Sequence, residues 1–182
     1  MRSIVSMTLA ACAVAAISSQ ALAQAPAPAT PPAPPSAGGT PDKMPFDIPY
    51  GPPISMDAAK RLVEASLAEA TKRGWKMAVA VVSPSGDLTY FAKMDDTLLA
   101  SADIAPRKAR TAVRFRRDTK LFFDQVEAGH PFVTTLDPTL VASPGGVPII
   151  VDGKLIGGIG CSGGINIQDA WVCQAGVNSL DK

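Results

Sequence analysis

A glycine-rich segment at residues 145–164, GGVPIIVDGKLIGGIGCSGG, limits the possible folds more than any other part of the chain. Two apolar runs flank Asp152-Gly153, a dipeptide that readily supplies the two positive-φ residues of a type I′ turn, so the segment is predicted to form a β-hairpin with a fixed register. The second strand contains Gly157, Gly158 and Gly160. A strand with so few side chains leaves space on its backbone for a planar ligand, a helix or another subunit.

The N-terminus has the features of a cleaved secretory signal. A positively charged start at Arg2 precedes an apolar run over residues 4–17, and Ala21-Leu22-Ala23 matches a signal-peptidase site. The apolar run is short for a membrane span. We therefore expect a signal peptide at residues 1–23, cleavage after Ala23, and a periplasmic or secreted protein with no membrane span. A lipoprotein box that ends at Cys12 is the alternative.

The next segment, residues 24–53, holds 11 of the 17 prolines and few charges, which predicts a disordered linker. Residues 54–182 are enough for one domain with one core. The chain has 17 basic and 16 acidic residues, and removal of Arg2 with the signal leaves equal numbers. This balance, together with export, argues against nucleic acid as a partner.

Apolar periodicity and turn residues predict the element order α-β-β-α-α-β-β-α for the domain. Because the strands come in hairpin pairs, we expect an α/β (α+β) fold with a largely antiparallel sheet and packed helices. The predicted elements are a helix capped by Ser55 and ending near Gly74, strands at 76–83 and 88–94, helices within 101–128 with a break at 116–119, the hairpin, and a final helix at about 168–180.

Two cysteines, Cys161 and Cys173, remain in the mature chain. Strand alternation places Leu155, Ile159 and Cys161 on one face, and the helical repeat places Cys173 on the same face as Val177. Both thiols are therefore expected to point into the same interior. A disulfide is natural for this pair in an oxidising compartment, and two reduced, buried cysteines are the alternative.

Several of these segments together resemble the GlcG/HbpS family, also called the haem-degrading domain family, which includes the C-terminal domain of PduO-type proteins. The matching segments are the glycine hairpin, Asp169, Lys93-Met94-Asp95-Asp96 and Lys108-Ala109-Arg110-Thr111-Ala112. The resemblance covers nearly all of residues 54–182 and implies a profilin-like domain, usually a homo-oligomer, that binds haem in several members. The cysteine pair is a departure, because many members lack it. No haem-ligand motif of the family carries over residue by residue.

A group of basic residues follows helical spacing and forms a cationic stripe if the helix is continuous. Its members are Arg107, Arg110, Arg114 and Arg117, with Lys108, Arg116 and Lys120 beside them. One interpretation is a solvated helix face paired with nearby aspartates such as Asp103, Asp118 and Asp124. The other is a patch that binds carboxylates, such as haem propionates or an organic acid, since arginine binds them bidentately.

His130 is the single histidine of the chain and lies on a predicted loop. It is a candidate axial ligand of haem iron or a general base, and an exposed loop histidine is the plain alternative.

The end of the hairpin, residues 158–163, satisfies the pattern G-x-G-x-x-G. A dinucleotide site would also need a following parallel strand, and the strand before this segment comes from a hairpin, so the sequence argues against that function. The N–H groups of Gly163 and Gly164 are candidates to hold an anion at the start of the last helix, and a tight turn that requires glycine is the alternative.

The leading hypothesis is an exported haem-binding protein of the GlcG/HbpS type, acting in haem sequestration, sensing or degradation. The candidate cofactor-binding residues are His130, Arg107, Arg110, Arg114, Gly158, Gly160, Gly163 and Gly164. One alternative is an accessory factor or enzyme for small organic acids, in which the arginines hold a carboxylate and Asp95 or His130 transfers protons. Another is an oligomeric interaction module without a ligand. The family resemblance implies binding more than catalysis, and the lack of a nucleophile elbow or catalytic triad argues against hydrolytic nucleophilic catalysis.

Overall fold

The computed structural model describes residues 43–180, so the expected signal peptide and most of the expected linker lie outside the described residues. The elements are α1 (Met56–Lys72), β1 (Ala78–Val82), β2 (Leu88–Lys93), α2 (Ser101–Phe115), α3 (Lys120–Glu127), a short 3-10 helix η1 (Pro131–Thr135), β3 (Gly146–Val151), β4 (Lys154–Ser162) and α4 (Asn166–Val177). This order of helices and strands confirms the prediction, with η1 as an addition. Within the described part, no helix is both long and apolar enough to cross a membrane.

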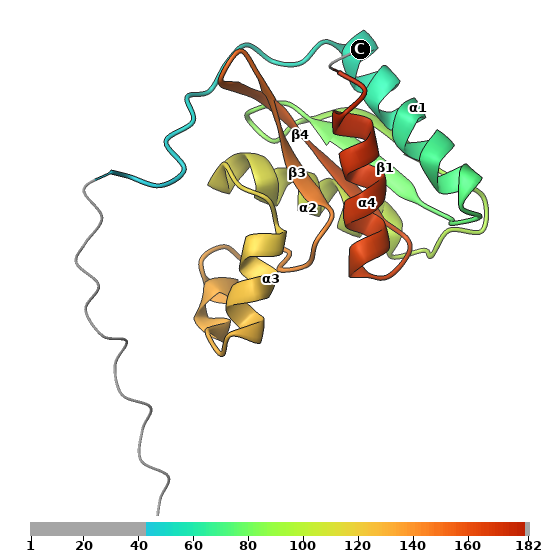
Figure 1. Ribbon diagram of the computed structural model, residues 1–182. Coiled ribbons are helices and arrows are strands. Elements are labelled where there is room, and N and C mark those ends of the chain that lie inside the picture. The colour runs from blue at the N-terminus through green and yellow to red at the C-terminus, as the bar shows by residue number, and fades with distance from the viewer. Residues whose placement is uncertain (1–42, 181–182) are drawn as a thin grey trace, which may run out of the picture. The chain divides into compact units, whose positions relative to one another are not determined.

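The four strands form one sheet in the order β2-β1-β4-β3, and every neighbouring pair is antiparallel. Figure 1 shows the hairpin strands β3 and β4 side by side, with β1 next to β4. The expected α/β fold with an antiparallel sheet and packed helices is confirmed.

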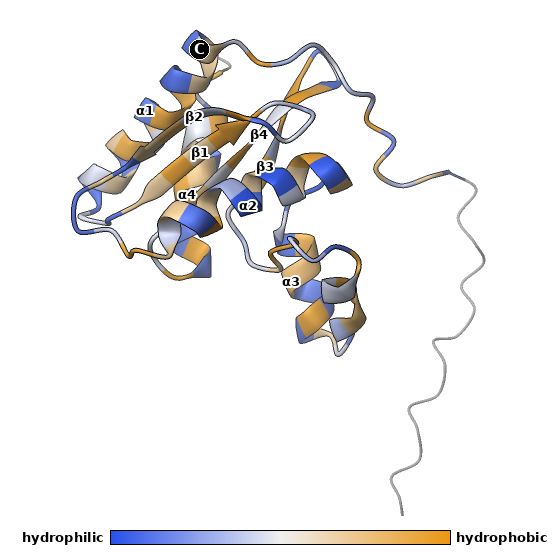
Figure 2. Cartoon of the chain, turned by 180° about the vertical axis from the view of Figure 1, so that it is seen from behind, coloured by the Kyte–Doolittle hydropathy of each residue, from blue (hydrophilic) through white to orange (hydrophobic). Residues whose placement is uncertain are grey.

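Helices cover both faces of the sheet. Helix α2 packs on β4, β1 and β3 on one face, while α1 and α4 pack together on the other. The side chains of β1 alternate between the two faces of the sheet. Ala78 and Ala80 pack against Ala105 of α2, while Val79 and Val81 belong to the core beneath α1 and α4. Figure 2 shows the resulting concentration of hydrophobic residues on the strands between the helices.

The hairpin turn has the expected geometry. Asp152 and Gly153 have φ angles of 49° and 71°, and Val151 pairs with Lys154 across the two-residue loop. One local prediction is wrong: Leu155 does not share a face with Ile159 and Cys161. The register shifts here, so that Ile156 forms a bulge, and Leu155 packs with Val82 and α2 instead.

The two cysteines are joined. Cys161 on β4 and Cys173 on α4 form a disulfide with a Cα–Cα distance of 5.6 Å, and both residues are fully buried. The pairing expected from strand and helix periodicity is therefore confirmed, and it fixes α4 to the sheet.

The helix boundaries have local causes. The Ser55 side chain accepts a hydrogen bond from the N–H of Ala58 and caps α1, as predicted. Helix α2 ends where Arg116 adopts a left-handed conformation with a φ of 53°. This residue lies in the predicted break between the two central helices.

The last residues of the expected linker are paired with the domain. The Gly51 N–H donates to the Leu155 carbonyl at 2.8 Å, and the Ile54 N–H donates to the Ile156 carbonyl at 2.8 Å. The Leu155 N–H in turn donates to the Pro49 carbonyl at 2.9 Å. The prolines here cannot donate, but their carbonyls and the N–H groups between them suffice for an extended segment to join β4.

Candidate functional site

The glycine face of β4 is covered by α2. A Cβ atom at Gly160 would collide with the carbonyl oxygen of Ala105, and one at Gly158 would lie 2.7 Å from Val113 and 2.9 Å from the Ala109 carbonyl oxygen. Of the three occupants considered for this backbone, the helix is the one present. Because α2 fills that face, Gly158 and Gly160 have no room there for a flat ligand, and their lack of side chains serves close helix–strand packing.

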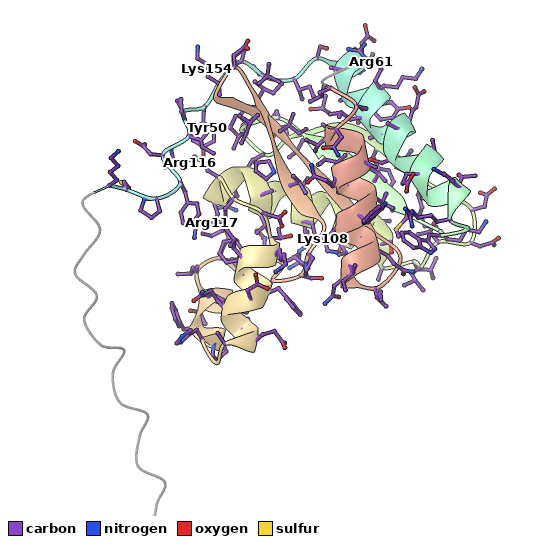
Figure 3. All side chains as sticks on the ribbon, viewed as in Figure 1. Tyr50, Arg61, Lys108, Arg116, Arg117 and Lys154 are labelled. Carbon is purple, nitrogen blue, oxygen red and sulfur yellow. A yellow bond between two sulfur atoms is a disulfide. The ribbon has the colours of Figure 1, made fainter. Side chains whose placement is uncertain are left out.

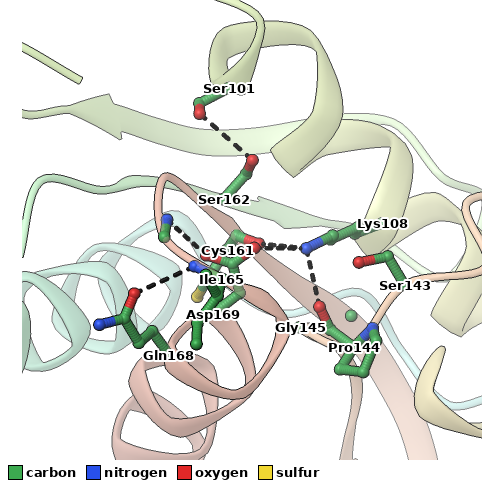
Figure 4. A network of polar contacts seen from close by, with 12 residues as sticks. Ser101, Lys108, Ser143, Pro144, Gly145, Cys161, Ser162, Ile165, Gln168 and Asp169 are labelled. Carbon is green, nitrogen blue, oxygen red and sulfur yellow. Dashed lines mark hydrogen bonds and ion pairs between the residues drawn. The ribbon is translucent and has the colours of Figure 1, made fainter. Parts of the chain in front are cut away.

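A buried ion pair lies beside this contact. Lys108 of α2 and Asp169 of α4 are 1% and 4% exposed, and Lys108 Nζ lies 2.7 Å from Asp169 Oδ2. Nζ also donates to the carbonyl oxygens of Pro144 at 2.7 Å and Cys161 at 3.1 Å. Figure 4 shows these contacts converging on Nζ. Three acceptors match the three protons of an ammonium group, so Lys108 is charged.

Burial is the largest influence on the pKa values of both residues of the pair. Burial lowers the pKa of the Lys108 ammonium, against the opposing attraction of Asp169. Burial likewise raises the pKa of the Asp169 carboxyl, because the effects of Lys108 and of the Gly163 and Gly164 N–H groups are smaller. Each partner therefore depends on the other to remain ionised inside the protein.

The N–H groups at the start of α4 bind a carboxylate of the protein itself, that of Asp169. Asp169 Oδ1 accepts a hydrogen bond from the Gly164 N–H at 3.0 Å, and Gln168 Oε1 accepts one from the Ile165 N–H at 3.0 Å. Gly163 is needed because a Cβ there would collide with the Lys76 carbonyl oxygen. The anion-binding role considered for Gly163 and Gly164 is thus filled internally by Asp169.

A pocket of about 440 Å³ lies above the ion pair, between α2 and the start of α4, and we call it the α2–α4 pocket. Its apolar lining includes Leu98, Ile104, Leu140 and Val141, and its polar lining includes Ser101, Arg107 and Ser162. Of the predicted site residues, it brings together Arg107, Gly163 and Gly164.

The arginines do not form one stripe. Arg114 pairs with Asp137 at 2.8 Å, and Arg110 donates to the Gly86 carbonyl in the turn between β1 and β2 at 3.0 Å. Arg117 lies beyond the end of α2. Lys108, which we placed beside the stripe, is buried. Arg107 and Arg114 both donate to Thr139, whereas Arg110 turns to the β1–β2 turn, and only Arg107 among the three candidate arginines lines the α2–α4 pocket.

A second pocket, of about 360 Å³, lies next to α3 and η1, and we call it the α3 pocket. Its lining includes Phe46, Arg117, Phe122, Phe132, Val133 and Leu136. The Arg117 guanidinium lies 3.7 Å from the centroid of the Phe46 ring and 5.3 Å from that of Phe122. Partial burial, followed by the nearby Arg116 charge, lowers the pKa of Arg117. Figure 3 shows both arginines on the side of the domain that faces residues 46–50.

His130 lies at the edge of the α3 pocket. It is exposed in the turn between α3 and η1, and its ring centroid is 6.3 Å from that of Phe132. The backbone N–H of His130 donates to the backbone carbonyl of Gln125, whose residue lines the pocket, at 2.9 Å. Among residues 43–180, no group of three or more histidine, cysteine, aspartate or glutamate side chains is arranged to hold a metal ion.

The ion pair is the feature that sequence reasoning missed. Lys108 and Asp169 were noticed as parts of a family resemblance, but 61 positions separate them in the chain. A signal does exist, because Lys108 falls among Ala105, Ala109 and Ala112 at the spacing of the buried face of α2. A lysine in the centre of an apolar stripe requires a buried partner.

Comparisons with known proteins agree with this fold. The family model described as "Haem degrading protein HbpS-like" matches residues 54–178. Protein GlcG of Escherichia coli (strain K12) is 39% identical over 110 residues, which cover 60% of this chain and 81% of GlcG. The crystal structure of a PduOC–heme complex has a TM-score of 0.65 and 32% identity, covering 70% of this chain and 94% of that one. A double mutant of Streptomyces reticuli HbpS has a TM-score of 0.67 and 26% identity, covering 80% of this chain and 99% of that one.

Proposed function

Because the chain belongs to the HbpS-like family of haem-degrading proteins, as the hairpin and the Lys108 segment indicated, we propose that it is an exported haem-binding protein that sequesters or senses haem. The relative solved as a heme complex supports haem as the ligand. The site that we propose is the α3 pocket.

The residues of the α3 pocket suit a haem group. A macrocycle needs apolar walls, an iron ligand and cations for its propionates. Phe122 and Phe132 provide aromatic walls, and His130 has its imidazole ring centroid 6.3 Å from that of Phe132. Arg117 is a partly desolvated cation that forms no ion pair within residues 43–180. The His130 ring, which lies next to Phe132 of this aromatic, cationic pocket without lining it, is the observation that carries the proposal.

The α2–α4 pocket suits haem less well. The lining of neither pocket contains histidine, methionine, cysteine or tyrosine, the side chains that usually hold haem iron, but His130 lies next to Phe132 of the α3 pocket and not next to a residue of this one. Lys108 beneath it already donates to three acceptors and is not free to bind iron. When bound in the α3 pocket, haem would supply the iron chemistry, while His130 would hold the iron and Arg117 a propionate.

Export is supported by the disulfide. A buried Cys161–Cys173 bond is typical of proteins that fold in an oxidising compartment, where the predicted signal peptide would deliver the chain. We further infer a homo-oligomer, as the family resemblance implies. Sedimentation of the purified chain that gives a single monomeric species would contradict this part of the proposal.

Titration of the purified chain with hemin tests the function. We expect a saturable shift of the Soret band at about micromolar hemin, where a Kd of 1 μM corresponds to about 8 kcal/mol of binding free energy. His130→Ala should change the position of the band because the axial ligand changes. Arg117→Gln should weaken binding without moving the band, since it removes a propionate contact.

Arg61→Gln is the matched control for charge. Arg61 is an exposed arginine on α1, on the face of the sheet opposite α2, and it lines neither pocket. A protein that gives no saturable shift overturns haem binding. A His130→Ala spectrum identical to that of the wild type overturns the assignment of the iron ligand.

A further inference from the structure

Arg107 places an unpartnered cation in the largest of the pockets described above. It is half-buried, and no carboxylate within residues 43–180 lies at ion-pair distance. The only hydrogen bond of its guanidinium to those residues runs from Nε to the Thr139 carbonyl at 3.4 Å, so both terminal nitrogens remain free. A guanidinium with two free nitrogens has the geometry that binds a carboxylate through two parallel hydrogen bonds.

Two buried hydroxyl groups in the same pocket offer a further donor. Ser101 and Ser162 are 1% and 5% exposed, and their Oγ atoms are 3.2 Å apart. That single hydrogen bond, drawn in Figure 4, uses one of the two hydroxyl protons. The other proton is available to an acceptor oxygen in the pocket.

The net charge and the apolar lining of the pocket limit the class of ligand that it can bind. Lys108 and Asp169 beneath it cancel each other, so Arg107 leaves one net positive charge. One cation matches a monoanion better than a phosphate, which carries more than one negative charge at neutral pH. Leu98, Ile104, Leu140 and Val141 form walls that suit a hydrocarbon group.

We propose that the α2–α4 pocket binds a short aliphatic monocarboxylate, with the carboxylate on Arg107 and an oxygen within reach of the Ser101–Ser162 pair. This site is separate from the α3 pocket, so the proposal does not depend on haem binding. The branched acid 3-methylbutyrate is a suitable probe, because its hydrocarbon group fits apolar walls.

Calorimetric titration with 3-methylbutyrate, its neutral amide and inorganic phosphate tests this assignment. We expect saturable binding of the carboxylate and none of the amide. Arg107→Gln should weaken carboxylate binding by about ten- to a hundredfold, the usual range for a hydrogen-bonded charged group. Ser162→Ala should weaken it by a smaller factor, and Arg61→Gln should leave it unchanged.

Three results would overturn the proposal. They are equal binding of acid and amide, tighter binding of phosphate than of the acid, and Arg107→Gln affinity equal to that of Arg61→Gln. Hemin titration of Arg107→Gln separates the two sites. Unchanged hemin binding supports two separate pockets, whereas loss of hemin binding in this variant would mean that Arg107 serves the haem site.

Discussion

Lys108 joins four parts of the domain through one ammonium group. It extends from α2 to the Pro144 carbonyl before β3, to the Cys161 carbonyl on β4 and to the Asp169 carboxylate on α4. Taking two charges out of water costs several kcal/mol per ion, which the contacts must offset. The pair therefore fixes the relative positions of these four segments more than it adds to the net free energy of unfolding.

Replacement of Lys108 alone should strongly reduce the stability of the fold. In Lys108→Met the Asp169 carboxylate loses its partner while it remains buried, and we expect the free energy of unfolding to fall by about 3–5 kcal/mol. Denaturant unfolding followed by circular dichroism measures this change. The double variant Lys108→Met/Asp169→Leu should recover much of the loss, because no charge is left inside. If both variants unfold at the same denaturant concentration as the wild type, the pair does not have this role.

The same variant should acquire a distinctive pH dependence. Burial already raises the pKa of Asp169, and removal of Lys108 removes two effects that oppose the rise. The folded state of Lys108→Met then binds a proton more readily than the unfolded state does. Asp169 therefore contributes stability below its unfolded pKa of about 4, and this contribution is lost as the pH rises through the higher folded pKa.

Unfolding of Lys108→Met at about pH 4 and about pH 8 checks the sign. The deficit relative to the wild type should be smaller in acid. Lys108→Met/Asp169→Leu, which has no carboxylate at this position, is the control and should lack the effect. A deficit that grows on acidification would contradict the account.

At the scale of elements, local chemistry made most of the fold predictable. The Asp152-Gly153 turn, the Ser55 cap and the apolar periodicity are short-range signals, and each has its expected counterpart in the structure. The bulge at Ile156 was missed because it depends on pairing with β3 and with residues 49–54. The glycines of β4 predicted that another group packs closely against its backbone. The sequence alone does not identify this group as a helix, a ligand or a subunit.

The disulfide should contribute measurably to the attachment of α4. Cys161 and Cys173 are 12 positions apart, and closing a loop of this size stabilises by roughly 3 kcal/mol in the chain-entropy model. A reducing agent should lower the free energy of unfolding by about this amount. Cys161→Ala/Cys173→Ala is the control, since its unfolding should not respond to the reducing agent. Wild-type stability that is equal with and without the reducing agent would contradict the contribution.

For the whole molecule, the site was less predictable than the fold because sites combine distant segments. The sequence pointed to Arg107 and His130, but it assigned them to one ligand. In the structure Arg107 lines the pocket between α2 and α4, whereas His130 lies next to Phe132 of the α3 pocket. The partners of each come from segments that no local pattern connects.

The proposed export has its own test. When the full sequence is expressed in a bacterium with a periplasm, the protein recovered from that compartment should begin at Gln24, because cleavage is expected after Ala23. Intact mass measurement identifies the start. Ala23→Asp should block processing, because the site requires a small residue. An unprocessed cytoplasmic chain, or a lipid on Cys12, would contradict the proposed route.

The position of haem iron tests the central proposal most directly. Crystals of the full chain with hemin, measured at the iron absorption edge, locate the metal by its anomalous scattering. The account predicts a peak at coordination distance from the His130 imidazole, with Arg117 on the same side of the domain. A peak beside Ser101 and Ser162 would contradict it, as would a hemin-saturated crystal in which the iron has no contact with His130.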